Sequence, residues 1–159
     1  MSNTNDSPLP KPPHSPVPFA ITIEVRDNCL CLHSQRAARA IARKFDEAFR
    51  PLDLKRGQFS ILMSLNRPNP PTLGEVAQLL GMDRTTLTAN LKPLERRGLL
   101  EVRTDLEDRR SRRLALTKEG LAILVDAVPL WEWTQAEIEQ SLGMTGDPDR
   151  LRADLNALL

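Results

Sequence analysis

The sequence predicts a mainly α-helical chain that carries one short β hairpin. Three observations support this fold class. Apolar residues recur at helical spacing over most of the chain, apolar and polar residues alternate with the two-residue period of strands in a single segment, and aromatic side chains are scarce. The 159 residues include four Phe, two Trp and no Tyr, so aliphatic side chains must fill the core. We expect about six helices and a two- or three-stranded β wing.

Residues 1–20 are predicted to form a disordered arm. Six prolines occur in the first 18 residues, with few apolar residues to anchor the segment. A solvated tail is the preferred interpretation, and a docking segment is the alternative.

Two helices are predicted after the arm. Apolar side chains repeat at helical spacing over residues 27–49, and Pro51 ends the pattern. A second helix covers residues 56–66 before a proline-rich run, residues 67–71, ends it.

A pair of helices joined by a tight turn follows. Thr72 and Glu75 can form a capping box at the start of a short helix that ends at Gly81. Asp83 is placed to cap the next helix, which Gly98 ends. Two helices joined by a turn that contains glycine form a helix-turn-helix motif.

Two strands and two further helices complete the chain. The alternation at residues 100–104 and 112–116 predicts a hairpin. A helix that begins at Thr117 contains Pro129 as a predicted kink, and a last helix covers about residues 149–158.

These elements predict three parts beyond the arm. They are a dimerisation helix at residues 27–54, a winged helix-turn-helix domain at residues 55–117 and C-terminal dimerisation helices at residues 118–159. The terminal helices carry more Leu, Ile, Val and Trp than one small winged helix can cover, so we expect a homodimer.

Charge is distributed unevenly along the chain, although the net charge is only +1. Residues 84–113 carry nine Lys and Arg against five Asp and Glu, whereas residues 118–159 carry three against eight. A basic segment inside a nearly neutral chain indicates which partners the chain can bind rather than how it folds.

The helix after Asp83 presents a polar face that suits a DNA groove. Leucines occupy one stripe, which leaves short hydroxyls and isolated cations on the remaining faces. Threonine can donate or accept at base edges or phosphates, and Arg84 is a candidate for guanine or a phosphate. The candidate contacts are Arg84, Thr85, Thr86, Thr88 and Lys92. A solvated helix face is the alternative, which the neighbouring capped helix and basic hairpin disfavour.

The tip of the hairpin carries four arginines within residues 109–113. A guanidinium binds phosphate oxygens bidentately and enters a narrow minor groove favourably, so we expect Arg109, Arg110 and Arg112 to contact DNA. Three carboxylates lie nearby, and Asp108 is the first candidate to pair with an arginine and hold the wing in shape, ahead of Asp105 and Glu107. A solvated turn is the alternative.

Signals for other classes of protein are missing from the sequence. Nowhere do 18 uncharged apolar residues follow one another, and no signal peptide is recognisable, so we expect a cytoplasmic protein without a membrane partner. The sequence has no Gly-x-Ser-x-Gly motif, no phosphate-cradling glycine loop and no metal-binding His pair, so we expect no enzyme and no cofactor. A winged-helix protein-interaction module without DNA readout is the alternative, which the basic wing disfavours.

The helix pair and the hairpin resemble the multiple antibiotic resistance regulator (MarR) family. The similarity is carried by residues 79–88 and 94–99, and by an Asp-x-Arg, five residues, Leu-Thr pattern at Asp108, Arg110, Leu116 and Thr117. With the flanking helices it covers roughly residues 27–159. Ala89 departs from the pattern, because many relatives carry a basic residue there, and contacts at that position are in doubt.

The resemblance implies how the chain would act. It implies a homodimer whose first and last helices intertwine and whose two winged helices bind a pseudo-palindromic operator in double-stranded DNA. It further implies repression that a small aromatic molecule or oxidation relieves. Dimer symmetry predicts half-sites about one helical turn apart, roughly 10 bp.

Cys31 is a candidate redox residue. Counting back from Gln58, it stands where the organic hydroperoxide-sensing branch of the family has its reactive cysteine, with Arg39 matching downstream. A thiolate at a helix N-terminus is stabilised by the helix dipole and by nearby cations. The tyrosines that assist that cysteine are missing, since Gln35 and Phe45 stand in their places. A buried inert cysteine is the alternative.

A metal site and a disulfide are both disfavoured in this region. Cys29, Cys31 and His33 supply at most three ligands, and His14 is the one other histidine, so a closed zinc site would need a second chain. Residues two apart point to different sides of a helix, which disfavours a Cys29–Cys31 bridge.

The resemblance also implies an apolar effector pocket between the DNA-reading part and the dimerisation helices. Its candidate lining residues are His33, Arg36, Phe59 and Trp131. A core or surface position is the alternative for each of them.

Overall fold

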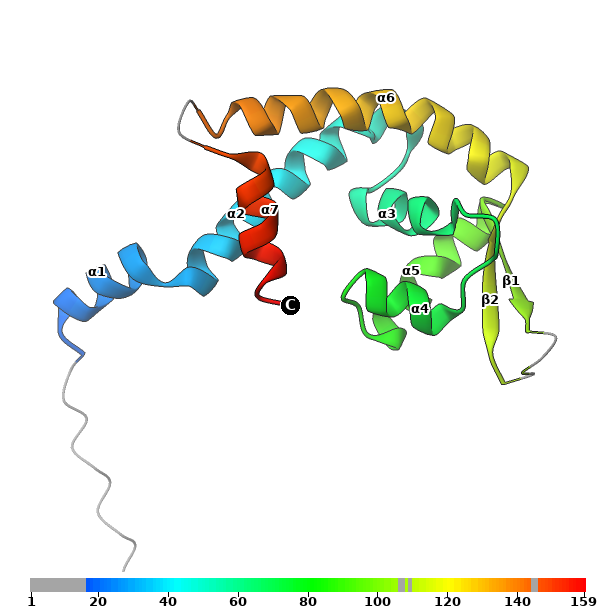
Figure 1. Ribbon diagram of the computed structural model, residues 1–159, viewed down its shortest axis with the longest axis horizontal. Helices are drawn as coiled ribbons and strands as arrows, with labels where there is room; N and C mark the ends of the chain where they lie inside the picture. The colour runs from blue at the N-terminus through cyan, green and yellow to red at the C-terminus, as the bar shows by residue number, and fades with distance from the viewer. Residues whose placement is uncertain (1–16, 106–107, 109, 144–145) are drawn as a thin grey trace, which may run out of the picture. The chain divides into compact units, whose positions relative to one another are not determined.

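The computed structural model describes residues 17–105, 108, 110–143 and 146–159. It confirms a mainly helical winged helix-turn-helix chain with an antiparallel hairpin (Figure 1). Within the described residues, no helix is both long and apolar enough to cross a bilayer. In chain order the elements are α1 (Phe19–Asn28), α2 (Leu30–Ala48), the 3-10 turn η1 (Arg50–Leu52), α3 (Arg56–Leu65), α4 (Leu73–Leu79), α5 (Arg84–Arg96), β1 (Leu100–Thr104), β2 (Arg112–Leu116), α6 (Lys118–Gln140) and α7 (Pro148–Asn156).

The chain divides into two compact units, residues 1–38 and 39–159. In the first unit the chain is already helical at Phe19, which lies within the predicted arm, and Cys29 interrupts the helix with an extended backbone. The sequence predicted one helix from about residue 27. The apolar residues of α1 are spread around the helix instead of forming one stripe, so the spacing of apolar residues does not predict this helix.

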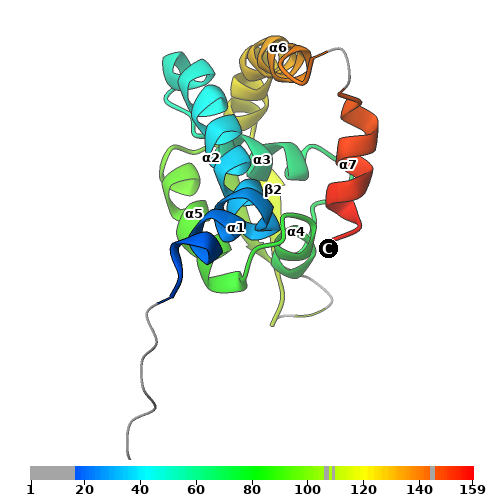
Figure 2. The ribbon, with the colours of Figure 1, turned by 90° about the vertical axis from the view of Figure 1, so that its left-hand side faces the viewer.

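The second unit contains the helix-turn-helix, and both of its predicted caps are confirmed. At the start of α4 the Thr72 N–H donates to Glu75 Oε2 at 2.6 Å, and the Glu75 N–H donates to Thr72 Oγ1 at 3.2 Å. The Asp83 carboxylate caps α5 by accepting from the Thr86 N–H at 2.8 Å. Gly81 supplies the positive φ of 61° that the turn between the helices needs. The helices α4 and α5 lie side by side (Figures 1 and 2).

The hairpin is joined to the segment that precedes α4. Strand β1 pairs antiparallel with β2, from Leu100 opposite Leu116 to Thr104 opposite Arg112. Arg113 forms an isolated bridge with Thr72, and the backbone of β2 donates a further hydrogen bond to the Pro71 carbonyl. The wing is therefore attached along one edge to the helix-turn-helix.

Helix α6 follows the hairpin directly. Its N-cap, Thr117, accepts from the Gly120 N–H at 2.9 Å and donates from its hydroxyl to the Gly98 carbonyl at 2.7 Å. Pro129 lies inside α6, which continues through it as one helix. Helix α7 is tied to α6 by the ion pair between Arg152 and Glu139 at 2.7 Å.

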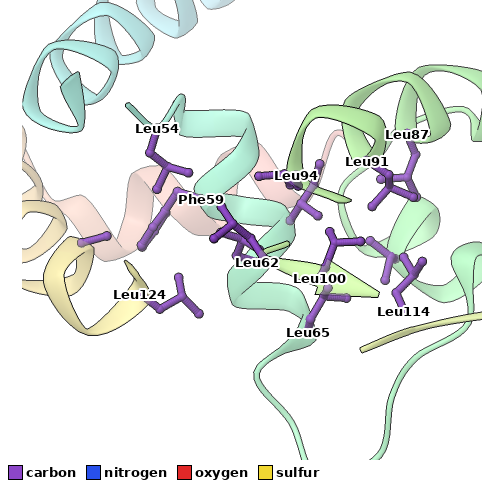
Figure 3. Close-up of a cluster of buried hydrophobic side chains, with 14 of the residues drawn as sticks. Leu54, Phe59, Leu62, Leu65, Leu87, Leu91, Leu94, Leu100, Leu114 and Leu124 are labelled. Atoms are coloured by element: carbon purple, nitrogen blue, oxygen red, sulfur yellow. The ribbon is translucent and has the colours of Figure 1, made fainter. Parts of the chain in front are cut away.

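The core of the second unit lies where α3, α5, α6 and the hairpin meet (Figure 3). The rings of Phe49 and Phe59 stack with their centroids 4.7 Å apart. Leucines from each of these elements complete the core, and Leu62, Leu87, Leu94, Leu100, Leu114 and Leu124 are each at most 2% exposed. Packing of this kind holds α5 with its leucine stripe inward and its polar face toward solvent.

Candidate nucleic-acid interface

Helix α5 presents the predicted polar face. Its leucine stripe is buried, and every candidate contact on the helix is exposed: Arg84, Thr85, Thr86, Thr88 and Lys92. We call the exposed side chains of Thr85, Thr88, Ala89 and Lys92 the reading face. At about 100° per residue they cover one continuous arc of the helix surface.

Two of the threonine hydroxyls already donate hydrogen bonds within the helix. Thr86 Oγ1 donates to Asp83 Oδ2 at 2.6 Å, and Thr88 Oγ1 donates to the Arg84 carbonyl at 2.7 Å. The Thr86 hydroxyl, together with the Thr86 N–H, holds the pKa of Asp83 below its ordinary value. The oxygens of these threonines therefore remain free to accept a hydrogen bond from an amino group of a base, and their methyl groups can contact the thymine methyl.

The start of α5, the start of α4 and the hairpin enclose a hollow of about 330 Å³. Its lining includes the guanidinium-bearing residues Arg84, Arg110 and Arg112, and we call it the arginine hollow. The Arg84 side chain reaches the backbone of Gly74, where a Cβ would lie at van der Waals distance, 3.4 Å, from Arg84 Nη2. The remaining residues of the lining are Thr72, Leu73, Gly74, Asp108 and Ser111.

The carboxylate that pairs with an arginine and holds the hairpin is Asp105, whereas the sequence pattern favoured Asp108 first for this role. The buried Asp105 carboxylate accepts from Arg113 Nε at 2.6 Å, and Arg113 Nη1 donates to the Pro70 carbonyl at 2.9 Å. In the described part of the hairpin Asp108 forms no ion pair. Its carboxylate instead accepts from the Arg110 N–H at 3.0 Å and shapes the turn.

A signal for Asp105 was present in the strand register. Arg103 stands opposite Arg113 in the hairpin, so the next residue on the same face of β1 is Asp105, diagonal to Arg113. A same-face diagonal neighbour is within reach of a long arginine side chain. Finding it required the register, which the spacing of carboxylates and arginines does not supply.

The other wing residues have separate positions. Arg110 is exposed, and Arg112 Nη1 donates to Thr104 Oγ1 at 2.8 Å. Arg109 and Glu107 lie outside the described residues. The basic side of the wing near α5 is thus carried, among described residues, by Arg110 and Arg112.

A second hollow, of about 450 Å³, lies between α3, the end of α4 and α6. It brings together two of the four predicted pocket residues, Phe59 and Trp131. The other two, His33 and Arg36, are exposed on the part of α2 that belongs to the first unit and are not part of this lining. We call it the apolar hollow, and its lining is Phe59, Ser60, Met63, Ser64, Leu79, Leu80, Val128 and Trp131.

The two cysteines are free thiols in different surroundings. Cys31 is exposed in the first turn of α2, where Gln35 Nε2 donates to its sulfur at 3.1 Å. Cys29 is half-buried and accepts from the Leu32 N–H at 3.5 Å. In the parts of the chain that the structure describes, no three His, Cys, Asp or Glu side chains are grouped as metal ligands.

Comparisons with known proteins agree with this architecture. A family model described as the MarR family matches residues 54–111. The structure of the M. tuberculosis transcriptional regulator MosR in complex with DNA is 40% identical, covers 82% of this chain and 93% of that one, and superposes with a TM-score of 0.74.

Two Bacillus subtilis proteins are similar over shorter stretches. The HTH-type transcriptional regulator YwoH is 36% identical over 85 residues, which is 54% of this chain and 61% of that protein, so the match leaves over a third of YwoH uncovered. The organic hydroperoxide resistance transcriptional regulator is 27% identical over 104 residues, 65% of this chain and 71% of that protein. With the capped helix pair, the attached wing and the match to MosR over nearly its full length, the chain belongs to the MarR family of winged helix-turn-helix transcriptional regulators.

Proposed function

We propose that the protein is a transcriptional repressor that binds a pseudo-palindromic operator in double-stranded DNA as a homodimer. The observation that carries the proposal is the arginine hollow, which gathers Arg84 of α5 with Arg110 and Arg112 of the wing beside the reading face. A helix that enters the major groove needs cations that contact the backbone at its side. The complex of the similar MosR protein with DNA supports the same kind of partner.

Arg84 is assigned to a phosphate rather than to a guanine. Its guanidinium lies over Gly74 at the start of α4 and shares a hollow with two wing arginines, instead of extending along the reading face. Guanidinium groups that meet from two elements suit the tetrahedral oxygens of one phosphate. Base readout then falls to the reading face, where Thr85 and Thr88 expose short side chains.

The homodimer is supported by helices that leave large apolar side chains exposed in the described part of the single chain. Neither α1, α2 nor α7 buries any residue. Helices of this length are stable in water chiefly when an apolar face is packed, so a second copy of the chain is the proposed cover. The large apolar side chains concerned are at least 41% exposed: Phe19, Ile21, Val25, Leu30, Leu151 and Leu155.

The apolar hollow is the proposed effector site. Among the described residues its lining carries no charge, and the two hydroxyls there are engaged, because Ser60 Oγ donates to the Arg56 carbonyl and Ser64 Oγ to the Ile61 carbonyl. An uncharged aromatic molecule that contacts Phe59 and Trp131 fits this chemistry best. Since the hollow lies between α4 and α6, an occupant would move the helix that supports α5 and thereby weaken DNA binding.

Thiol oxidation is a second candidate signal, supported by the exposure of Cys31 in the first turn of α2. The Cys31 thiolate would attack the terminal oxygen of an organic peroxide, which forms a sulfenate on the protein and releases the corresponding alcohol. The similarity to the organic hydroperoxide resistance regulator supports this choice of oxidant.

A salt titration on two duplexes tests the proposal. Operator DNA is first selected from random sequence with the full chain, and binding to it and to a random duplex is then measured against salt. We expect a steep slope, about −0.9 per phosphate contact on a plot of log K against log salt, with tighter binding to the operator. Weak binding with a flat salt response would overturn the proposal and favour a protein-interaction module.

A further inference from the structure

We propose that Lys55 and Arg56, at the start of α3, form a second contact to the DNA backbone, on the side of the reading face away from the arginine hollow. This inference rests on the proposed DNA binding. The added contact uses neither the reading face nor the wing, so an experiment can reject it and leave the proposed DNA binding standing.

The helical geometry of α5 places two hollows on opposite flanks of the reading face. Arg84 lines the arginine hollow, and Asn90 lines a different hollow of about 290 Å³ at the start of α3. Six residues at about 100° each separate their side chains by about 240° around the helix. Thr85 and Ala89 lie within that arc, so one hollow borders each side of the reading face.

The hollow beside Asn90 is basic at its rim. Lys55 and Arg56 both line it and are exposed, with Met82 from the turn before α5 as a neighbour. One carboxylate, Asp46, shares the hollow, and it accepts from the Arg56 N–H at 2.8 Å. The described lining of this hollow therefore carries two positive charges and one negative charge, and the carboxylate already accepts a hydrogen bond from the backbone.

Neither cation is held by an ion pair in the described part of the chain. Other basic residues differ in this respect, since Arg50 pairs with Glu47 at 2.6 Å and Arg103 with Glu101 at 2.8 Å. A paired arginine must leave its carboxylate before it can bind a phosphate. Lys55 and Arg56 have no ion pair among the described residues that must break before they bind a phosphate.

The shape of the major groove explains why a basic flank on each side is useful. The groove is about 12 Å wide and a helix with its side chains is about 10–12 Å across, so a helix that lies in it faces a phosphate strand on both sides. The arginine hollow serves one strand. The Lys55 and Arg56 side chains are placed on the flank that faces the other.

The packing of α3 and α5 makes this second contact a rigid one. Arg97, at the end of α5, donates to the carbonyls of Leu52 and Asp53 just before α3. Leu54 at that point is 1% exposed and belongs to the same core as Leu94. The start of α3 is therefore fixed to α5, and its cations keep their register with the reading face.

Substitution of single cations tests the inference. Lys55→Gln and Arg56→Gln are compared with Lys118→Gln, a matched control that removes one positive charge from an exposed lysine at the start of α6. The probe is a random-sequence duplex, because phosphate contacts carry no sequence information. Each α3 variant should make the salt slope shallower by about 0.9 per phosphate lost, or about 1.8 for a dimer, whereas Lys118→Gln should match the wild type.

Two further measurements keep the outcome clear. Arg56→Lys keeps the charge and should restore the slope, and circular dichroism should show equal helix content in all variants. A wild-type slope in both glutamine variants would overturn the second contact while the proposed function stands. A flat response of the wild type itself would overturn the proposed function and this inference with it.

Discussion

The buried carboxylate of Asp105 accepts a hydrogen bond from Arg113 Nε at 2.6 Å, and this pair anchors the hairpin to the helix-turn-helix. Arg113 extends the link through its hydrogen bond to the Pro70 carbonyl. A wing that is held at its base keeps Arg110 and Arg112 beside α5. The position of Arg110 and Arg112, the proposed phosphate contacts, thus depends on the buried carboxylate of Asp105.

Asp105→Asn tests this anchor. Loss of a charge-assisted hydrogen bond to a buried acceptor should lower the free energy of unfolding by about 1–3 kcal/mol, measured by urea denaturation. Glu101→Gln breaks the exposed pair with Arg103 and is the control, with an expected change within about 0.5 kcal/mol. Equal effects of the two variants would contradict the role given to Asp105.

Acid should weaken the helix-turn-helix through its caps. The Thr86 hydroxyl and N–H lower the pKa of Asp83, and the Thr72 backbone N–H, followed by its side chain, lowers the pKa of Glu75. A carboxyl whose pKa is lowered by folding stabilises the protein above its unfolded pKa, and this stabilisation is lost as the pH falls through the folded pKa.

The measurement is the urea midpoint as the pH is lowered from about 6 through the ordinary carboxyl pKa values of about 4, where the unfolded chain begins to bind protons that the folded caps do not. Asn caps a helix about as well as Asp, so Asp83→Asn should leave stability at neutral pH nearly unchanged and reduce the loss in acid. If the variant and the wild type lose stability in parallel, Asp83 does not contribute to the acid transition.

Gly120 should tolerate no side chain. A Cβ at this position, in the first turn of α6, would lie 1.9 Å from the Leu99 carbonyl oxygen and 2.8 Å from Leu116 Cδ1. Gly120→Ala should therefore lower the free energy of unfolding by at least about 1–3 kcal/mol. Gly57, in the first turn of α3, has no neighbour within 4 Å of such a Cβ, so Gly57→Ala should be neutral or slightly stabilising. Urea denaturation of both variants and the wild type measures the two effects.

Arg84→Ala and Arg110→Ala should weaken DNA binding without changing the oligomeric state of the protein. Because both residues line the arginine hollow, each variant should lose affinity for operator and random duplex by the same factor. A double-mutant cycle in fluorescence anisotropy should give a coupling of about 0.5–3 kcal/mol between them. Additive losses would place the two guanidinium groups on separate phosphates, and unchanged affinity in Arg110→Ala would mean that the wing makes no contact.

Cys31→Ser distinguishes the two candidate signals. If oxidation of the exposed thiol releases the operator, treatment with an organic peroxide should abolish binding by the wild type and spare the serine variant. Cys29→Ser is the control at the half-buried thiol and should respond like the wild type. Release of all three proteins, or of none, would contradict sensing through Cys31.

The elements that could be predicted from the sequence are those defined by near neighbours in the chain. The Thr72 and Glu75 box, the Asp83 cap and the two-residue alternation of the strands all depend on side chains within four positions of one another. Helix α1 escaped prediction because its apolar residues form no stripe and Cys29 interrupts the helix. Asp105 was ranked behind Asp108 because only the strand register shows which carboxylate meets Arg113.

By itself the sequence determined the order of the elements, the inward leucine stripe of α5 and the polar character of its exposed face, since backbone propensity and periodicity are local properties. The tertiary structure alone decided which distant side chains meet. It joined Arg84 to the wing arginines, brought Phe59 and Trp131 to one hollow, and set Lys55 and Arg56 beside Asn90. Such meetings follow from how helices pack on a shared core, and packing depends on the shape of the whole unit, which no short stretch of sequence contains.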